Sequence, residues 1–247
     1  MSQATFTLNI SKTMSVAKTQ LTLRLSPQEI YHFDNYLFAK TETKQALEAF
    51  CQLDNLDFLY LYGETGTGKT HLLIACAEKV QQLGFRVIYL SLAELIKTSQ
   101  PAVLQSLEHA DLLCLDDIEA VAGQPDWEVA LFHCFNRLHD AKGSLLVATE
   151  HNPANTLIKL PDLRSRLATG LVYQLTNMTD EQKQQALVLQ SQTRGLTMSE
   201  EVAQYLLRHY GRDMPALMTV LQQLDKASLQ AKRKLTIPFI RQVLAGD

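Results

Sequence analysis

Residues 63–70 read Gly63-Glu64-Thr65-Gly66-Thr67-Gly68-Lys69-Thr70, which matches the pattern G-x-x-x-x-G-K-[ST] at every defined position. In such a loop the glycines let successive backbone N–H groups turn inward on phosphates, and the N-terminus of the following helix adds its positive dipole end. The pattern predicts that Lys69 reaches the β and γ phosphates and that the Thr70 hydroxyl ligates Mg²⁺. A flexible glycine-rich turn is the alternative, and the predicted strand before the loop and helix after it argue against that alternative.

Strands and helices alternate around this loop. Apolar runs predict strands at 57–62, 86–90, 111–115, 144–149 and 171–175. Helical periodicity predicts helices at 39–51, 71–83, 93–98, 127–141 and 163–168. This alternation favours an α/β fold in which a parallel five-stranded sheet is covered by helices on both faces. Only helices are predicted farther on, at 181–192, 200–210, 214–232 and 237–244, which indicates a small all-α C-terminal domain.

The bulk composition is that of an ordinary globular protein. The 247 residues are 46% apolar and 20% charged, which suits one sizeable core with a small satellite domain. No apolar run is long enough to cross a bilayer and no signal-peptide core is recognisable, so we expect a cytoplasmic protein without membrane contact. The net charge of −3 disfavours DNA as the primary ligand. The only concentrated basic patch is 232–234, so we expect any DNA contact to be weak or indirect.

Cysteine and histidine spacing gives no sign of a metal site. The four cysteines are scattered without a C-x-x-C pair, and the seven histidines show no ligand spacing. We therefore expect no metal bound directly by histidine or cysteine. Buried, reduced thiols are the favoured interpretation of the cysteines, which are Cys51, Cys76, Cys114 and Cys134.

A second phosphate-site motif is the apolar run 112–115 followed by Asp116 and Asp117. A buried strand that ends in a carboxylate predicts that Asp116 holds Mg²⁺ through its water shell and that Asp117 orients a water at the γ phosphate. The alternative is that Asp116 and Asp117 are two surface acids at a strand end, and the phosphate-binding loop upstream makes this alternative the less favoured one. Asp117 is one methylene shorter than a glutamate, so the motif supports nucleotide binding more firmly than hydrolysis.

Two further residues fit the same chemistry. Thr149 ends the fourth predicted strand, where its hydroxyl would sense the γ phosphate, although a strand-end threonine with a purely structural role fits almost as well. Arg166 lies on a short predicted helix before the last strand. A cation there would reach a neighbouring subunit's nucleotide and stabilise transition-state charge. A solvated arginine is the alternative, and the residues alone do not decide between them.

Together these residues resemble the AAA+ ATPases, and within them the DnaA branch, over nearly the whole chain from Tyr31 onward. The segment 31–36 resembles the one that lines the adenine side of the pocket in that family. Residues 68–73 resemble its P-loop exit, which adds His71 to the expected cofactor-binding residues. Residues 163–167 resemble its box VII, which carries the arginine finger over to Arg166. The resemblance thus implies an AAA+ P-loop fold with a helical lid, binding ADP or ATP with Mg²⁺ through 63–71.

Within the DnaA branch, the chain resembles the regulatory inactivators, because neither a C-terminal DNA-binding domain nor an N-terminal helicase-interaction domain is recognisable. This resemblance implies two partners, DnaA and the DNA polymerase III sliding clamp (the β subunit), and homo-oligomers are also conceivable. It implies a protein that stimulates hydrolysis of DnaA-bound ATP and so prevents re-initiation of replication. We expect domains at 1–26, 27–177 and 178–247, which are a disordered tail, the nucleotide-binding domain and the lid.

The predicted tail contains a candidate clamp-binding peptide. An extended peptide with an amide anchor and alternating leucines fills apolar pockets on a partner while its flanks stay mobile. The regulatory inactivators carry such a peptide, of the form Q-L-x-L-x-L, near the N-terminus. The residues of this chain that fit its spacing are Gln20, Leu21, Leu23 and Leu25.

The lid departs from the family at one position. DnaA-like lids contact the nucleotide with an arginine near the start of the third lid helix, where this chain has Pro215. Arg212 is close by, but its spacing does not reveal whether it reaches the phosphates. We therefore expect weak intrinsic ATPase activity, with ADP as the working ligand. A helicase loader of the DnaC type with robust ATPase activity is the alternative function, and a clamp-binding adaptor whose nucleotide only stabilises the fold is a third.

Overall fold

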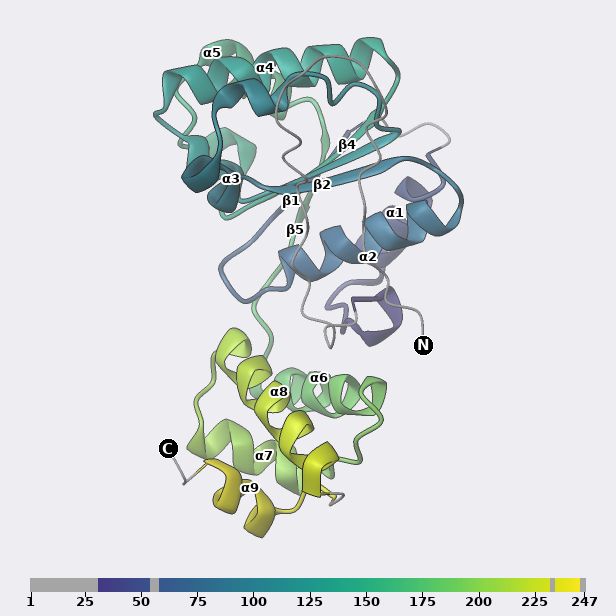
Figure 1. Ribbon diagram of the computed structural model, residues 1–247, viewed down its shortest axis with the longest axis vertical. Helices are drawn as coiled ribbons and strands as arrows, with labels where there is room; N and C mark the ends of the chain where they lie inside the picture. Colours follow the sequence, from purple (N-terminus) through teal and green to yellow (C-terminus); the bar gives the residue numbers. More distant parts are fainter. Residues whose placement is uncertain (1–30, 54–57, 232–233, 245–247) are drawn as a thin grey trace.

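The computed structural model describes residues 31–53, 58–231 and 234–244, and Figure 1 shows an α/β body joined to a group of helices at one end. Within these residues, five strands form one parallel sheet in the order β2-β3-β4-β1-β5. The strands are β1 (Phe58–Tyr62), β2 (Val87–Ser91), β3 (Leu112–Asp116), β4 (Ser144–Thr149) and β5 (Leu171–Gln174). The predicted fold class, a parallel five-stranded sheet flanked by helices with a helical lid, is confirmed.

Helices cover both faces of the sheet (Figure 1), with α1 (Thr41–Phe50) and α2 (Lys69–Gln82) on one face and α3 (Leu92–Thr98), α4 (Pro125–Asp140) and α5 (Pro161–Leu167) on the other. Successive residues of a strand point to opposite faces. Leu59 and Leu61 accordingly pack in the core beneath α1 and α2, whereas Phe58 and Tyr60 pack in the core beneath α3 and α4. This double burial explains the near-continuous apolar runs of the central strands.

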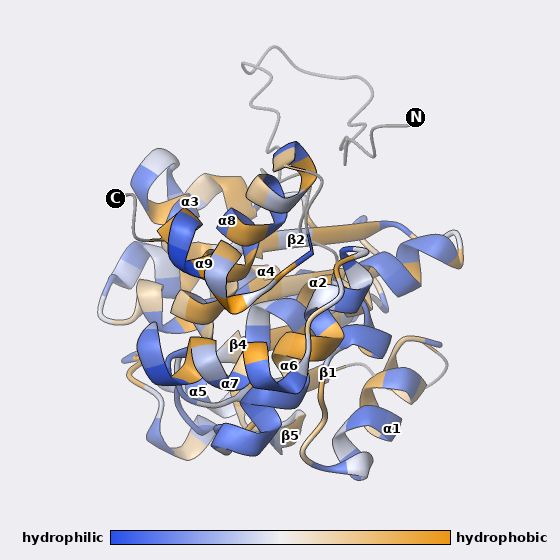
Figure 2. Cartoon of the chain, turned by 90° about the horizontal axis from the view of Figure 1, so that it is seen from below, coloured by the Kyte–Doolittle hydropathy of each residue, from blue (hydrophilic) through white to orange (hydrophobic). Residues whose placement is uncertain are grey.

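The strand β5 forms one edge of the sheet and is largely exposed. Leu171 is 45% exposed and Val172 is 40% exposed, whereas every residue of β3 and β4 is buried. Figure 2 shows the apolar colouring gathered on the central strands, with polar residues on the outward sides of the surrounding helices. Along the chain, β5 lies between α5 and the first helix of the lid.

The lid is built from α6 (Asp180–Thr193), α7 (Glu200–His209), α8 (Met214–Ala231) and α9 (Ile237–Leu244). Its own core gathers leucines that recur at helical spacing, including Leu206 on α7 and Leu217, Leu221 and Leu224 on α8, each fully buried. Thr179 begins α6 with a capping box, since its hydroxyl accepts from the backbone N–H of Gln182, whose side chain accepts in return. Across the described ranges, no helix combines the length and the apolar character needed to cross a membrane.

The predicted elements are present, and the differences lie at their ends. The helix α4 begins at Pro125 and α5 begins at Pro161, each two residues before the predicted start, because proline fits the first helical turn. The helix α2 begins at Lys69, so the last P-loop residues already form its first turn. Short 3₁₀ turns were not predicted because a single turn has no detectable period; they are η1 (Phe33–Asn35), η2 (Pro101–Leu104), η3 (Ile118–Val121) and η4 (Pro153–Asn155).

Some predictions fall wholly or partly outside the described residues. The candidate clamp-binding peptide and the predicted domain boundary at 26/27 lie outside them. So do residue 57 of the first predicted strand and residues 232–233 of the basic patch. The second predicted boundary, at 177/178, falls in the segment between β5 and α6. The cysteines are all described, and each is a buried free thiol, as predicted.

Candidate functional site

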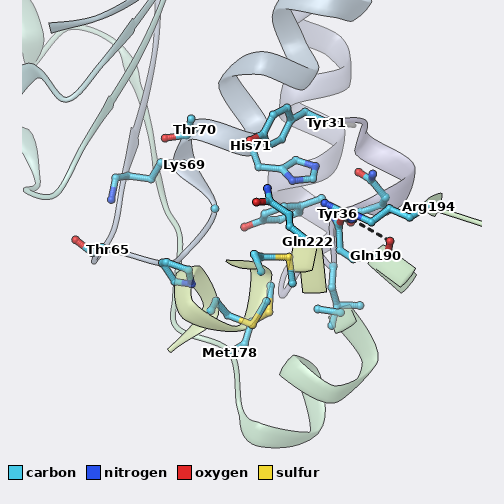
Figure 3. Close-up of a pocket in the computed structure, with 18 of the residues that line it drawn as sticks. Tyr31, Tyr36, Thr65, Lys69, Thr70, His71, Met178, Gln190, Arg194 and Gln222 are labelled. Atoms are coloured by element: carbon cyan, nitrogen blue, oxygen red, sulfur yellow. Dashed lines mark hydrogen bonds between the residues drawn. The ribbon is translucent and has the colours of Figure 1, made fainter. Parts of the chain in front are cut away.

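A cavity of about 390 Å³ lies where the P-loop, the segment 31–37 and the lid meet. Its walls come from far-apart parts of the chain. Figure 3 shows Thr65, Lys69 and Thr70 on one side and Gln190 and Arg194 of the lid on the other. This volume suits a nucleotide-sized ligand, since small-molecule sites are clefts of about 300–1,000 Å³.

The P-loop is shaped by contacts that require glycine. Gly68 has a φ of +87°, and a Cβ atom there would lie 2.5 Å from the ring of Tyr36. The Tyr36 hydroxyl in turn donates a hydrogen bond to the carbonyl oxygen of Thr67, at 2.7 Å. Gly66 has a φ of +86° and faces Pro215 of the lid, whose Cδ lies 3.0 Å from the Cβ position. The loop is therefore held from both sides, by the aromatic segment and by the lid.

Lys69 carries a buried positive charge inside this loop. Its Nζ donates to the carbonyl oxygens of Gly63, at 2.7 Å, and of Glu64, at 3.1 Å, and the residue is 8% exposed. No carboxylate of the described residues forms an ion pair with it. A buried cation without a counter-charge is costly, and an anionic ligand relieves that cost. The P-loop as folded thus fits a phosphate group.

The remaining P-loop side chains brace the loop. The Thr67 hydroxyl donates to the carbonyl oxygen of Glu64, at 2.8 Å, and the Glu64 carboxylate accepts from the side-chain amide of Asn177, at 2.6 Å. The Thr65 hydroxyl donates to the carboxylate of Glu150, in the segment that follows β4. Among the predicted cofactor-binding residues, Thr65, Gly66, Gly68, Lys69, Thr70 and His71 line the cavity.

Oxygen ligands for a cation meet beside the loop. The Thr70 hydroxyl donates to Asp116 Oδ2 at 2.5 Å, and the Tyr89 hydroxyl donates to the same oxygen at 3.0 Å. Burial raises the pKa of Asp116 to about 6, and the nearby charge of Asp117 adds to this rise, while the bonds from Thr70 and Tyr89 oppose it. A hydroxyl and a carboxylate in contact match the ligand set that Mg²⁺ prefers.

The two predicted γ-phosphate residues are placed differently. Asp117 lines the cavity in a left-handed conformation, with a φ of 57°, and its carboxylate accepts from the Ser91 hydroxyl at 2.9 Å. Thr149 is buried and is absent from the cavity lining, and its hydroxyl accepts from the backbone N–H of His151 at 3.4 Å. Glu150, the next residue, lines the cavity instead.

An aromatic group forms the wall beyond the P-loop. The His71 ring lies 5.2 Å from the ring of Tyr31 and 5.3 Å from that of Tyr36, measured between centroids. Its Nε2 is 3.0 Å from the carbonyl oxygen of His32. Burial lowers the pKa of His71 to about 4, so the imidazole is neutral near pH 7. A neutral aromatic wall suits the stacking of a base.

The lid offers a different cation from the one considered in the sequence. Arg212 is paired with Asp180 at 3.3 Å and does not line the cavity. Arg194 does line it, and its guanidinium donates to Gln190 at 2.7 Å, while the Gln190 amide donates to the carbonyl oxygen of Asn35 at 2.7 Å. Sequence reasoning missed Gln190 and Arg194, because one helical turn among polar residues carries no signal of its own.

Arg166 lies apart from this cavity. It is exposed on α5, and its guanidinium lies 5.9 Å from the centroid of the Phe135 ring on α4. It is not among the residues that line the cavity. The side chain is thus presented to the surroundings of the protein rather than to its own candidate nucleotide site.

Comparisons with known proteins agree with this geometry. The family model described as the bacterial DnaA ATPase domain matches residues 27–174, and the model described as the Hda lid domain matches residues 180–244. A protein of Haemophilus influenzae, described as uncharacterized, is 44% identical over 188 residues, which are 76% of this chain and 81% of that one.

Solved structures match the fold. Domain III of DnaA from Thermotoga maritima superposes with a TM-score of 0.73 at 22% identity, covering 87% of this chain and 95% of that one. DnaA from Aquifex aeolicus, bound to AMPPCP, gives a TM-score of 0.63 at 24% identity, covering 80% of this chain and 65% of that one. At these identities the similarity concerns the fold alone.

Proposed function

This chain belongs to the bacterial DnaA family of AAA+ ATPase domains and carries an Hda lid domain, and we propose that it regulates DnaA by promoting hydrolysis of DnaA-bound ATP. Family membership supports nucleotide binding and a role in regulating replication. The observation that carries the finer proposal is the position of Arg166, which is exposed on α5 and outside its own cavity. An arginine in this position would act on the nucleotide of a neighbouring molecule rather than on the nucleotide bound by its own chain.

In the proposal, the nucleotide of this chain is ADP and its role is to hold the working conformation. Lys69 and the P-loop N–H groups would hold its phosphates, and Thr70 with Asp116 would hold Mg²⁺, which neutralises phosphate charge when bound. Two features favour ADP over ATP. Pro215 rather than a cation faces the P-loop from the lid, and Glu150, whose carboxylate accepts from the Thr65 hydroxyl, lines the cavity, where its negative charge disfavours a further one.

The chemistry of the proposal takes place in DnaA. The guanidinium of Arg166 would stabilise the charge that develops on the transferred phosphoryl group of DnaA-bound ATP. An arginine supplied in this way raises phosphoryl-transfer rates by about 10³–10⁵. The sliding clamp would be bound through Gln20, Leu21, Leu23 and Leu25, which lie outside the described residues, so this part of the proposal rests on the sequence. The setting would be the cytoplasm.

The test is a reconstitution with DnaA–ATP, clamp-loaded DNA and this protein carrying ADP. Arg166→Ala is expected to abolish stimulated ATP hydrolysis, while the matched control Arg164→Ala, an exposed arginine of the same helix, retains it. Stimulation by Arg166→Ala at the parent rate would refute the proposed role. Steady ATP turnover by the protein alone, together with binding to a hexameric helicase, would favour the loader alternative.

A further inference from the structure

Glu128 is a buried carboxylate that the nucleotide site does not use. It is 2% exposed and lies in the first turn of α4. Its Oε1 accepts from the backbone N–H of Gly123 at 2.6 Å, and its Oε2 accepts from that of Leu160 at 2.6 Å. The N–H of Lys159 lies 3.0 Å from both oxygens. Three backbone donors thus converge on one side chain. Hydrogen bonds to an ionised carboxylate are stronger than those between neutral groups.

These donors belong to two different loops. Gly123 ends the turn that begins at Asp117, so it belongs to the segment directly after the acidic strand end of the nucleotide site. Lys159 and Leu160 immediately precede α5, and Leu160 is its N-cap residue. One carboxylate therefore joins the loop after β3 to the start of the helix that carries Arg166.

The helix α5 depends on such contacts for its orientation. It has seven residues, and a helix of that length is not stable by itself in water. Leu163 and Leu167 bury one side of it, and Arg166 lies over Phe135, which is about two turns farther along α4 than Glu128. The helix α4 thus holds α5 twice, at its N-terminus through Glu128 and near its C-terminus through Phe135.

We infer that Glu128 is a positioning residue for Arg166, fixing the start of α5 so that the guanidinium is presented in one orientation to the nucleotide of the partner. The inference rests on the proposed function, because it presupposes that Arg166 acts on DnaA-bound ATP. Glu128 itself touches neither nucleotide. Since an arginine finger contributes in the transition state, a displaced finger lowers the maximal rate and leaves the affinity for the partner nearly unchanged.

The experiment compares the parent with Glu128→Gln in the reconstituted assay, varying the concentration of this protein. The substitution keeps the shape but places an NH₂ group among N–H donors. We expect the maximal stimulated rate to fall about 10- to 100-fold, in line with the cost of an ångström-scale misplacement. The half-maximal concentration is expected to stay within about twofold of the parent value, because uniform binding is unchanged. Glu108→Gln is the matched control, because Glu108 pairs with Arg137 on α4 at 3.5 Å, and it is expected to retain the parent rate.

The fraction of molecules that bind ADP separates positioning from general damage. If Glu128 acts through Arg166, Glu128→Gln binds ADP as the parent does and loses only the stimulated rate. A fall in the fraction of molecules that bind ADP equal to the loss of rate would overturn the inference in favour of a structural role. Should Glu128→Gln fail to fold, Glu128→Asp keeps the charge, withdraws the carboxylate by one methylene and is tested in the same assay.

The two hypotheses fail in different ways. If Arg166→Ala stimulates hydrolysis like the parent, the proposed function falls and takes the inference with it. If Arg166→Ala is inactive while Glu128→Gln matches the parent in maximal rate, only the inference falls.

Discussion

Replacing Gly68 by alanine tests the shape of the P-loop most directly. The substitution acts through two terms that the structure separates. Gly68 has a φ of +87°, where an L residue costs about 1–2 kcal/mol. The new Cβ would also lie 2.5 Å from the Tyr36 ring, which must move and give up its hydrogen bond to Thr67, worth about 1 kcal/mol. Together these terms amount to roughly 2–3 kcal/mol.

In the ligand-free variant the loop relaxes and relieves this strain, whereas ADP binding requires the strained conformation, so the affinity for ADP falls. A difference of 2–3 kcal/mol corresponds to an affinity lower by about 30- to 150-fold. Calorimetric titration with ADP measures this value, and urea unfolding of the ligand-free protein is expected to show a stability close to that of the parent.

Gly84→Ala is the matched control. Gly84 has a φ of +93°, but no heavy atom of the described residues, apart from Gly84 and the two residues next to it, lies within 4 Å of its Cβ position. The control therefore carries the backbone strain without the collision, and ADP binding should remain at the parent level. The reasoning is refuted if Gly68→Ala binds ADP like the parent, or if both variants weaken binding equally.

Three further outcomes are expected. Arg86 holds the pKa of Asp111 below its usual value, so the ion pair stabilises the fold above the unfolded pKa near 3.8 and this contribution is lost as the pH falls through the lower folded pKa. Asp111→Asn should lower the free energy of unfolding by at most about 1 kcal/mol at pH 7, and urea titrations should show no difference from the parent once the pH lies below the folded value. Gln190→Ala removes the hydrogen bond from the Gln190 amide to the carbonyl oxygen of Asn35 and should cost about 1 kcal/mol in urea unfolding and weaken ADP binding in the same titration. Asp116→Asn should remove the dependence of ADP affinity on Mg²⁺, so that chelation by EDTA changes the parent's affinity and not the variant's.

The sequence carries the order of elements and the P-loop, because both depend on local patterns. Leu59 and Leu61 alternate with Phe58 and Tyr60 in an apolar run that only a strand buried on both faces explains. The helix predicted at 71–83 is followed by Gly84, whose positive φ suits the residue just after a helix end, and this role follows from local chemistry alone.

The cavity walls depend on tertiary geometry, and there prediction was incomplete. Thr149 was expected to face the phosphates, yet its neighbour Glu150 lines the cavity, since the direction of a side chain at a strand end depends on the turn that follows. Arg194 and Gln190 line the same cavity as the P-loop, on its opposite side, only because the lid folds back toward the loop. Local sequence patterns do not reveal which distant segments lie side by side in the fold.

The exposed edge at β5 has a consequence for handling the protein. An edge strand presents unpaired backbone N–H and C=O groups, and Leu171 and Val172 add apolar surface to it. Natural sheets usually protect such edges with charge, bulges or a covering element. Here the edge lies directly after the helix that carries Arg166, so a partner that receives this arginine would also shield it. The protein should therefore be least soluble when it is purified without that partner, and its aggregation should involve the exposed edge at β5.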